Sequence, residues 1–340
     1  MKAHRIAYTY CDLCNQVPKC GMKVHVEGDR IVRVEDRENY PAGPLCVKGL
    51  AILEEQYHPD RLLYPLKRTA PKGSPDAGWT RISWDEAYRT IATKLNEVKT
   101  KYGPDKVGFF VGDHKEPRPA VQRLAYTFGS PNYGTESSLC SRSAVMASQL
   151  TFGVATVGGR PANQTRSCLI WSRNLAHTTP FEMERLQQAK KQGVKFVVVD
   201  PRVTPTVQQL ADIHLQLRPG TDGALALGMI HLMTKGEGLF DSDFAGRWTF
   251  GFPELVRYAE EFSPEEVERI TWVPKERVAE AVSLLATNRP VTWIGSPSAT
   301  VHSSNGLQNH RAILSLVALT GDFDVPGGLT MPTHPLPLHT

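Results

Sequence analysis

Four of the six cysteines in this 340-residue chain lie within its first 46 residues, and this cluster constrains the fold more than any other feature. Six cysteines are too few for a disulfide scaffold in a chain of this length. The clustered residues are Cys11, Cys14, Cys20 and Cys46. Thiolates separated by two residues can share a metal centre, and four thiolates suit either tetrahedral zinc or a 4Fe–4S cluster. A triplet followed by one distant cysteine favours the iron–sulfur cluster over zinc or unrelated buried thiols.

The residues between the third and fourth cysteines predict a β-hairpin. Met22–Glu27 and Arg30–Glu35 alternate between apolar and polar residues, and the two-residue turn Gly28–Asp29 joins them. A loop rich in proline and glycine, 41–44, then leads to Cys46. The cysteines therefore belong to a small β module.

The rest of the chain alternates between predicted helices and buried strands, which indicates an α/β fold with a parallel sheet. A capping-box pattern at Ser83–Glu86 begins one helix, which ends before Gly103–Pro104. A strand at 168–171, a helix from Pro180 to Gln192 with Thr179 as its N-cap, and a strand at 194–199 form a βαβ unit. We expect further strands at 107–111, 213–217 and 291–295, and further helices at 117–128, 222–234, 253–261, 264–270, 275–287 and 305–319. Cys168, inside an apolar strand, is expected in the core.

Charge and hydropathy exclude several classes of function. The formal net charge of +4 is too small for a dedicated nucleic-acid binder. No apolar run approaches the roughly 20 residues of a membrane helix. The first residues carry no apolar signal segment and no twin arginine, so we expect a cytoplasmic protein without a membrane span, or a periplasmic one if a leader has been trimmed from this sequence.

Three sequence stretches carry a resemblance to a known family: Gly43–Gly49 around Cys46, His58–Arg68, and Trp79–Ala87. Together they closely resemble the start of the molybdopterin oxidoreductase family, of the dimethyl sulfoxide reductase type. The resemblance extends from Cys11 to about Gly328. It implies a 4Fe–4S cluster on the four clustered cysteines, and a molybdenum or tungsten ion held by two molybdopterin guanine dinucleotides. The chain departs from the family in having five residues between Cys14 and Cys20, where members usually have three.

The same resemblance predicts the domain organisation. We expect an iron–sulfur module at 1–65, part of an α/β domain at 66–140, a Rossmann-like dinucleotide-binding domain at 141–328 and a proline-rich tail at 329–340. We expect the β-barrel domain that closes over both pterins in the family to be absent from this chain. We therefore expect a fragment, a truncated reading frame or one half of a split enzyme, completed by the missing domain or by a second chain.

The resemblance assigns candidate roles near the metal. Cys140 aligns with the residue that binds the metal in the family, and its small, polar surroundings, 134–143, are expected to form a loop. Lys48 matches a lysine between the cluster and the nearer pterin. Arg142 and Arg160 are candidate cations for an anionic substrate, although a surface or pterin-facing position explains them equally well.

The dinucleotide is expected at the carboxyl ends of the strands, where ligands bind in open α/β sheets. No Gly-x-Gly-x-x-Gly or phosphate-binding loop motif follows a strand, so the usual NAD and ATP cradles are not indicated. In the family, three loops after strands hold a guanine dinucleotide. Asp222 suits the guanine N–H groups, Asp200 the ribose hydroxyls and Arg202 the pyrophosphate. The remaining candidates in these loops are Ser172, Asn174 and Gly220. Gly295, a further cofactor candidate, resembles another family loop near the metal.

These assignments predict an oxidoreductase in which an iron–sulfur partner subunit supplies electrons to the cluster and, past Lys48, to the metal at Cys140. Formate dehydrogenases of the family generally have histidine after the metal ligand, whereas Ser141 follows here. The Cys-Ser-x-Ser pattern is similar to that of reductases acting on thiosulfate, polysulfide and related chalcogen oxyanions such as arsenate. The alternatives are a non-redox tungsten enzyme like acetylene hydratase, a formate dehydrogenase, a non-catalytic electron-transfer or assembly subunit, and a zinc-binding interaction module.

Overall fold

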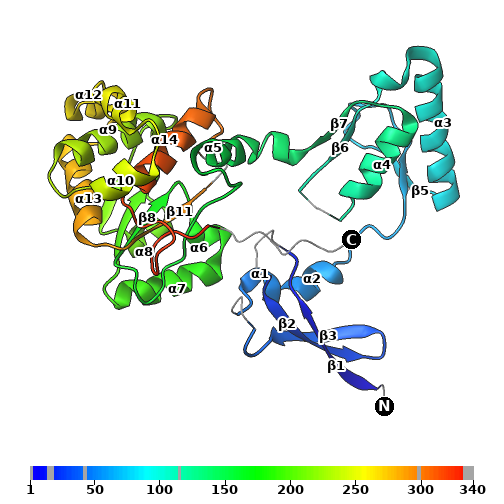
Figure 1. The fold of residues 1–340 in the computed structure, drawn as a ribbon. Helices are drawn as coiled ribbons and strands as arrows, with labels where there is room; N and C mark the ends of the chain where they lie inside the picture. Colours follow the sequence, from blue (N-terminus) through cyan, green and yellow to red (C-terminus); the bar gives the residue numbers. More distant parts are fainter. Residues whose placement is uncertain (1–2, 14–18, 41–43, 114–115, 297–299, 332–340) are drawn as a thin grey trace, which may run out of the picture. The chain divides into compact units, whose positions relative to one another are not determined.

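The computed structural model describes residues 3–13, 19–40, 44–113, 116–296 and 300–331. The chain divides into two compact units, Met1–Glu136 and Ser137–Thr340, which are described separately (Figure 1). Among the described residues, no helix has the length and apolar character needed to cross a bilayer.

The first unit begins with an antiparallel sheet of three strands in the order β1-β2-β3. The strands are β1 (His4–Tyr10), β2 (Gly21–Glu27) and β3 (Arg30–Asp36). The predicted hairpin is confirmed: Gly28 takes a positive φ of 64° in its turn, a conformation that favours glycine. Two short helices follow, α1 (Val47–Leu50) and α2 (Ile52–Gln56). This is the small β module that the alternating residues between the cysteines predict.

The remainder of the first unit combines helices with short strands. Its elements are β4 (Leu66–Arg68), β5 (Trp79–Arg81), α3 (Trp84–Tyr102), the 3-10 turn η1 (Pro104–Lys106), β6 (Phe109–Val111), α4 (Arg118–Phe128) and β7 (Tyr133–Thr135). The predicted capping residue is confirmed, since the Ser83 hydroxyl accepts a hydrogen bond from the Glu86 amide. Strands β6 and β7 pair in parallel.

The second unit contains a parallel four-stranded sheet with the order β10-β9-β8-β11. Its strands are β8 (Ser167–Trp171), β9 (Lys195–Val199), β10 (Ile213–Leu215) and β11 (Val291–Gly295). This is the 3-2-1-4 order of a Rossmann-like sheet, with its switch point between β8 and β11. The α/β expectation is therefore confirmed.

Helices cover both faces of this sheet (Figure 1). Leu169 and Trp171 of β8 face the core formed largely by α9 (Asp222–Lys235), α13 (Lys275–Thr287) and α14 (Gly306–Leu319). The alternate residues Cys168 and Ile170 face the opposite core. The helices on that second face are α6 (Leu175–Thr178), α7 (Pro180–Lys191) and α8 (Pro205–Leu210). This burial confirms Cys168 as a core residue, and it raises the pKa of the Cys168 thiol.

Four helices complete the second unit: α5 (Arg142–Phe152), α10 (Ser242–Trp248), α11 (Phe252–Ala259) and α12 (Pro264–Thr271). The strand expected at 213–217 was wrong at its end, since it stops at Leu215. Thr179 is the N-cap of α7, as predicted, although its side chain makes no capping hydrogen bond. Pro180 occupies the first turn of α7, also as the sequence indicated.

Candidate metal and cofactor sites

Three of the four clustered cysteines lie in described segments that contact one another, and Cys14 lies outside the described residues. The Cys11 amide donates a 2.8 Å hydrogen bond to the Cys20 carbonyl, and both side chains are buried. Cys46 immediately precedes α1, where a Cβ built on Gly49 would come within 3.4 Å of Cys11 Sγ. At the end of β3, Asp36 accepts a hydrogen bond from the Leu45 amide, which fixes the approach to Cys46.

This donor set fits an iron–sulfur cluster in its chemistry. Cys11, Cys20 and Cys46 offer soft sulfur ligands from segments held together by the main-chain contacts above. Within the described part of the chain, which omits Cys14, no three His, Cys, Asp or Glu side chains already meet around one metal position. The ligand roles of the four cysteines remain predictions.

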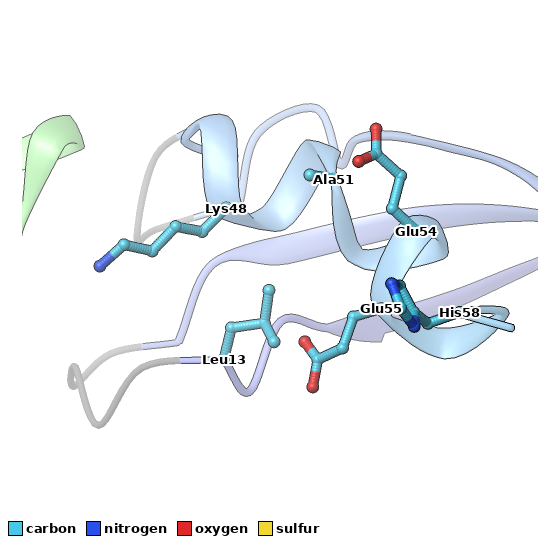
Figure 2. A pocket seen from close by; sticks show the side chains of 6 residues that line it. All are labelled: Leu13, Lys48, Ala51, Glu54, Glu55 and His58. Atoms are coloured by element: carbon cyan, nitrogen blue, oxygen red, sulfur yellow. The ribbon is translucent and has the colours of Figure 1, made fainter. Parts of the chain in front are cut away.

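Lys48 lines a cavity of about 500 Å³ in the same module (Figure 2). The other lining residues are Leu13, Ala51, Glu54, Glu55 and His58. Figure 2 shows Lys48 and His58 at opposite ends of the view, with Lys48 extended away from α2. No ion pair involving Lys48 occurs among the residues that the structure describes. A lysine beside the cluster loop, which includes Leu13, has the charge needed to stabilise an arriving electron.

Cys140 lies between the 3-10 turn η2 (Glu136–Ser138) and helix α5. The expectation of a loop across 134–143 was therefore wrong at both ends. Thr135 still belongs to β7, and Arg142 already belongs to α5, with Ser141 as its N-cap. Small polar residues hid this helix start, because serine favours N-cap positions as much as loops.

Cys140 opens into a cavity of about 470 Å³ within the second unit. Four serines and a histidine provide its polar lining, and Leu139 and Val301 its apolar lining. The polar residues are Ser138, Ser143, His302, Ser303 and Ser304. His302 Nε2 lies 3.2 Å from the Cys140 carbonyl oxygen. The sequence analysis missed His302, and no local signal marks it, since 162 positions separate it from Cys140.

Neither candidate arginine lines the Cys140 cavity. Arg142 is exposed on the first turn of α5. Arg160 lies 3.6 Å from the buried carboxylate of Glu182, which also pairs with Arg173 at 3.4 Å. Arg160 therefore balances a buried negative charge, and the substrate role considered for it gains no support.

Five of the predicted dinucleotide residues do meet. Ser172, Asp200, Arg202, Gly220 and Asp222 line one cavity of about 160 Å³ at the carboxyl ends of β8, β9 and β10. Pro201, Leu217 and Pro219 complete its wall. The convergence follows from topology, because adjacent parallel strands end at the same edge of the sheet.

Asp200 lines this cavity and is held in place by hydrogen bonds. Its side chain accepts a 2.8 Å hydrogen bond from the Arg202 amide, and its carbonyl lies 2.8 Å from Nε2 of His214. Asp200 is buried, whereas the Arg202 guanidinium, 4.0 Å away, is largely exposed. The loop therefore presents an anchored carboxylate beside an exposed planar cation, a combination suited to hydroxyls and phosphate.

Asp222 begins α9 and lines the same cavity. Its carboxylate accepts a 2.8 Å hydrogen bond from Trp171 Nε1, inside the protein. Burial raises the pKa of Asp222, and hydrogen bonds from Trp171 and Ser172 act in the opposite direction. Ser172 reaches it from a left-handed turn, with φ 52°, directly after β8.

The structure does not bring Asn174 or Gly295 into this cavity. Asn174 precedes α6, and its side-chain oxygen accepts a hydrogen bond from Thr206. Gly295 ends β11, where a Cβ would lie 2.2 Å from the Trp293 ring. Both residues have a local structural explanation, so their cofactor roles remain predictions.

Two family models match the chain. The molybdopterin oxidoreductase model covers residues 61–333, and the molybdopterin oxidoreductase Fe4S4 domain model covers residues 5–58. The first match includes both second-unit cavities, and the second includes all four clustered cysteines. These domains carry a 4Fe–4S cluster and a molybdenum or tungsten molybdopterin cofactor, as the sequence analysis expected.

Individual relatives agree with the models. Acetylene hydratase of Syntrophotalea acetylenica is 31% identical over 326 residues, covering 93% of this chain and 43% of the relative. The thiosulfate reductase molybdopterin-containing subunit PhsA of Salmonella typhimurium is 29% identical over 322 residues, covering 94% and 41%. The solved acetylene hydratase of Pelobacter acetylenicus matches with a TM-score of 0.78 and 28% identity, covering 95% and 44%. The chain thus spans less than half the length of these relatives.

Proposed function

Because the chain belongs to the molybdopterin oxidoreductase family, we propose that it is part of an enzyme that reduces a small sulfur or arsenic anion, an oxyanion such as thiosulfate or arsenate or the sulfur anion polysulfide. One observation carries the proposal: Cys140 shares its cavity with four serines and a histidine. Hydroxyl and imidazole N–H groups donate hydrogen bonds to anionic oxygens. A cavity of this kind suits a small oxyanion better than an apolar substrate.

We propose that Cys140 supplies the protein ligand to molybdenum or tungsten. When bound, the metal cofactor supplies the two-electron chemistry. Cys140 would hold the metal at the cavity, while Ser143 and Ser303 would orient the oxyanion by hydrogen bonding. The cavity opens to solvent on the exposed His302 side, from which the protons that accompany the electrons can enter.

The dinucleotide arm of the cofactor is proposed to occupy the smaller cavity. The two oxygens of Asp222 would accept hydrogen bonds from guanine, a pairing that adenine cannot offer. Asp200 would bind ribose hydroxyls and Arg202 the pyrophosphate. The contacts would hold one guanine dinucleotide.

Electrons are proposed to arrive from an iron–sulfur partner subunit through the cluster at Cys11, Cys14, Cys20 and Cys46. Lys48 would stabilise the electron on its way to the pterin. The first unit also presents apolar side chains on α3, including Trp84, Tyr88 and Ile91, each more than half exposed. We propose that the assembled enzyme covers this face with further polypeptide, from the same or a second chain.

Acetylene hydration is the second candidate, favoured by the similarity to acetylene hydratase in both sequence and solved structure. The two reactions differ in electron demand, since hydration consumes none. We would isolate the assembled enzyme without air through a tag on this chain, and assay oxidation of reduced viologen with thiosulfate, polysulfide and arsenate. Oxyanion-dependent oxidation that disappears in Cys140→Ala is the expected result. Acetylene hydration without viologen oxidation would replace the proposal with the second candidate.

A further inference from the structure

The segment Thr300–Asn305, here called the serine loop, is held from both sides by helix α14. At its start, the Thr300 hydroxyl lies 2.7 Å from His310 Nδ1. At its end, the Asn309 side chain donates a 3.1 Å hydrogen bond to the Ser303 hydroxyl. The Gly306 amide also donates to the Ser303 carbonyl at 3.1 Å. These contacts place His302 on a short, doubly anchored loop.

Close packing at Gly306 keeps the serine loop tight. A Cβ built on Gly306 would lie 2.1 Å from the Val301 carbonyl oxygen, a distance that no real side chain could occupy. Both Val301 and Gly306 are buried. The loop is therefore packed onto the first turn of α14, and His302 extends from it to the exposed side.

His302 joins this loop to the main chain of Cys140. A carbonyl oxygen can only accept a hydrogen bond, so Nε2 of His302 must carry the proton that it donates to the Cys140 carbonyl. Directly after Cys140, α5 packs against α14, with Ala147 in the shared core. Cys140 thus lies between a helix that rests on α14 and a side chain whose loop is anchored to the same helix.

We propose that His302 is a positioning residue that fixes the backbone of Cys140 and thereby holds its thiol toward the cavity that both residues line. A metal ligand needs such support, because groups behind the ligand orient it and tune its binding. Only the consequence for metal retention rests on the proposed function; the restraint on Cys140 is a property of the second unit.

The test is residue-resolved alkylation of Cys140 by iodoacetamide in the metal-free 340-residue chain, read by mass spectrometry of the cleaved protein. His302→Leu removes the donor, and His302→Gln keeps an N–H of similar reach. His177→Leu, on exposed α6, is the matched control. Because His302 holds the thiol toward the open cavity, its loss lets the thiol turn away, and we expect Cys140 alkylation to be about fivefold slower in His302→Leu, the factor equivalent to a net hydrogen bond of about 1 kcal/mol. The His302→Gln variant and the control should stay near the wild-type rate.

Cys168 provides an internal check of folding, because it is fully buried in the same unit and must stay unreactive. If Cys168 becomes reactive in His302→Leu, the Ser303→Ala variant is tested instead, since this change loosens the serine loop while leaving His302 in place. Slower alkylation of Cys140 with Cys168 still protected is again expected. A Cys140 alkylation rate at or above the wild-type rate in His302→Leu, or in Ser303→Ala where it is used, overturns the proposal, as does His302→Gln reacting like His302→Leu.

Metal content separates this inference from the proposed function. In protein purified without air, His302→Leu should retain less molybdenum or tungsten than His302→Gln. If Cys140→Ala retains the metal fully, the ligand assignment fails, whereas the alkylation result still decides whether His302 restrains Cys140.

Discussion

The indole N–H of Trp171, the last residue of β8, donates a buried 2.8 Å hydrogen bond to the carboxylate of Asp222, the first residue of α9. This contact joins the end of one strand to a helix that begins 51 residues later. Each carboxylate oxygen has two acceptor sites, so the indole leaves capacity for a ligand in the adjacent cavity. The bond orients the side chain on which guanine selectivity is proposed to depend.

The first prediction concerns that selectivity. Asp222→Asn replaces one acceptor oxygen with an N–H₂ donor that faces the guanine donors, so the preference for guanosine over adenosine diphosphate should fall about tenfold or more. Equilibrium dialysis with both nucleotides measures it. Asp243→Asn, an exposed aspartate on α10, is the control. Equal preference in Asp222→Asn and wild type would remove Asp222 from the site.

The second prediction concerns the pH dependence of stability. Because burial raises the pKa of Asp222 in the folded state, its ionisation disfavours folding as pH rises through that pKa. Asp222→Asn should therefore gain stability relative to wild type between about pH 4 and pH 7. Urea unfolding of both proteins at the two pH values gives the comparison. An equal stability difference at both pH values would show that burial does not raise the pKa of Asp222.

The third prediction involves His310, whose pKa burial lowers to about 4. As pH falls, His310 takes up a proton near its ordinary pKa of 6.5 in the unfolded chain, and only near the lower pKa in the folded state. The folded state therefore has its full stability above pH 6.5 and loses on the order of 3 kcal/mol as pH drops toward 4. His310→Asn keeps a polar group near Thr300 but does not titrate. Urea unfolding should show a smaller acid loss in that variant, and an equal loss would contradict the assignment.

The parallel sheet and the dinucleotide cavity could be predicted from the sequence because their signals are local. Short apolar runs mark β8, β9 and β11, and topology then brings Ser172, Asp200 and Asp222 to one edge. The sequence is less informative about a candidate site residue whose side chain instead bonds to a residue outside the site. Asn174 bonds Thr206 within its own layer, and Arg160 pairs with Glu182.

His302 shows the limit of sequence reasoning most clearly. Its contact with Cys140 depends on α5 packing against α14, a tertiary relationship that no periodicity encodes. Helix α5 itself was hidden because Ser141 and Ser143 suit a loop as well as a helix start.

The fourth prediction tests whether Cys20, separated from Cys14 by five residues, belongs to the ligand set. Cys20→Ser removes one of four thiolates, so the variant should lose most of its iron and its broad visible absorption. Cys168→Ser is the control, because Cys168 is a buried core residue. Iron and absorbance are measured on protein purified without air. Full iron in Cys20→Ser would show that another residue completes the ligand set.

The most direct test of the whole account is simultaneous mass-spectrometric analysis of iron, molybdenum, tungsten and zinc in the protein purified without air. Wild type and Cys140→Ala are compared, from cells supplied with both molybdate and tungstate. The account predicts about four iron atoms per chain in both proteins, and molybdenum or tungsten in wild type that falls in Cys140→Ala. One zinc per chain without iron, in either protein, would contradict it.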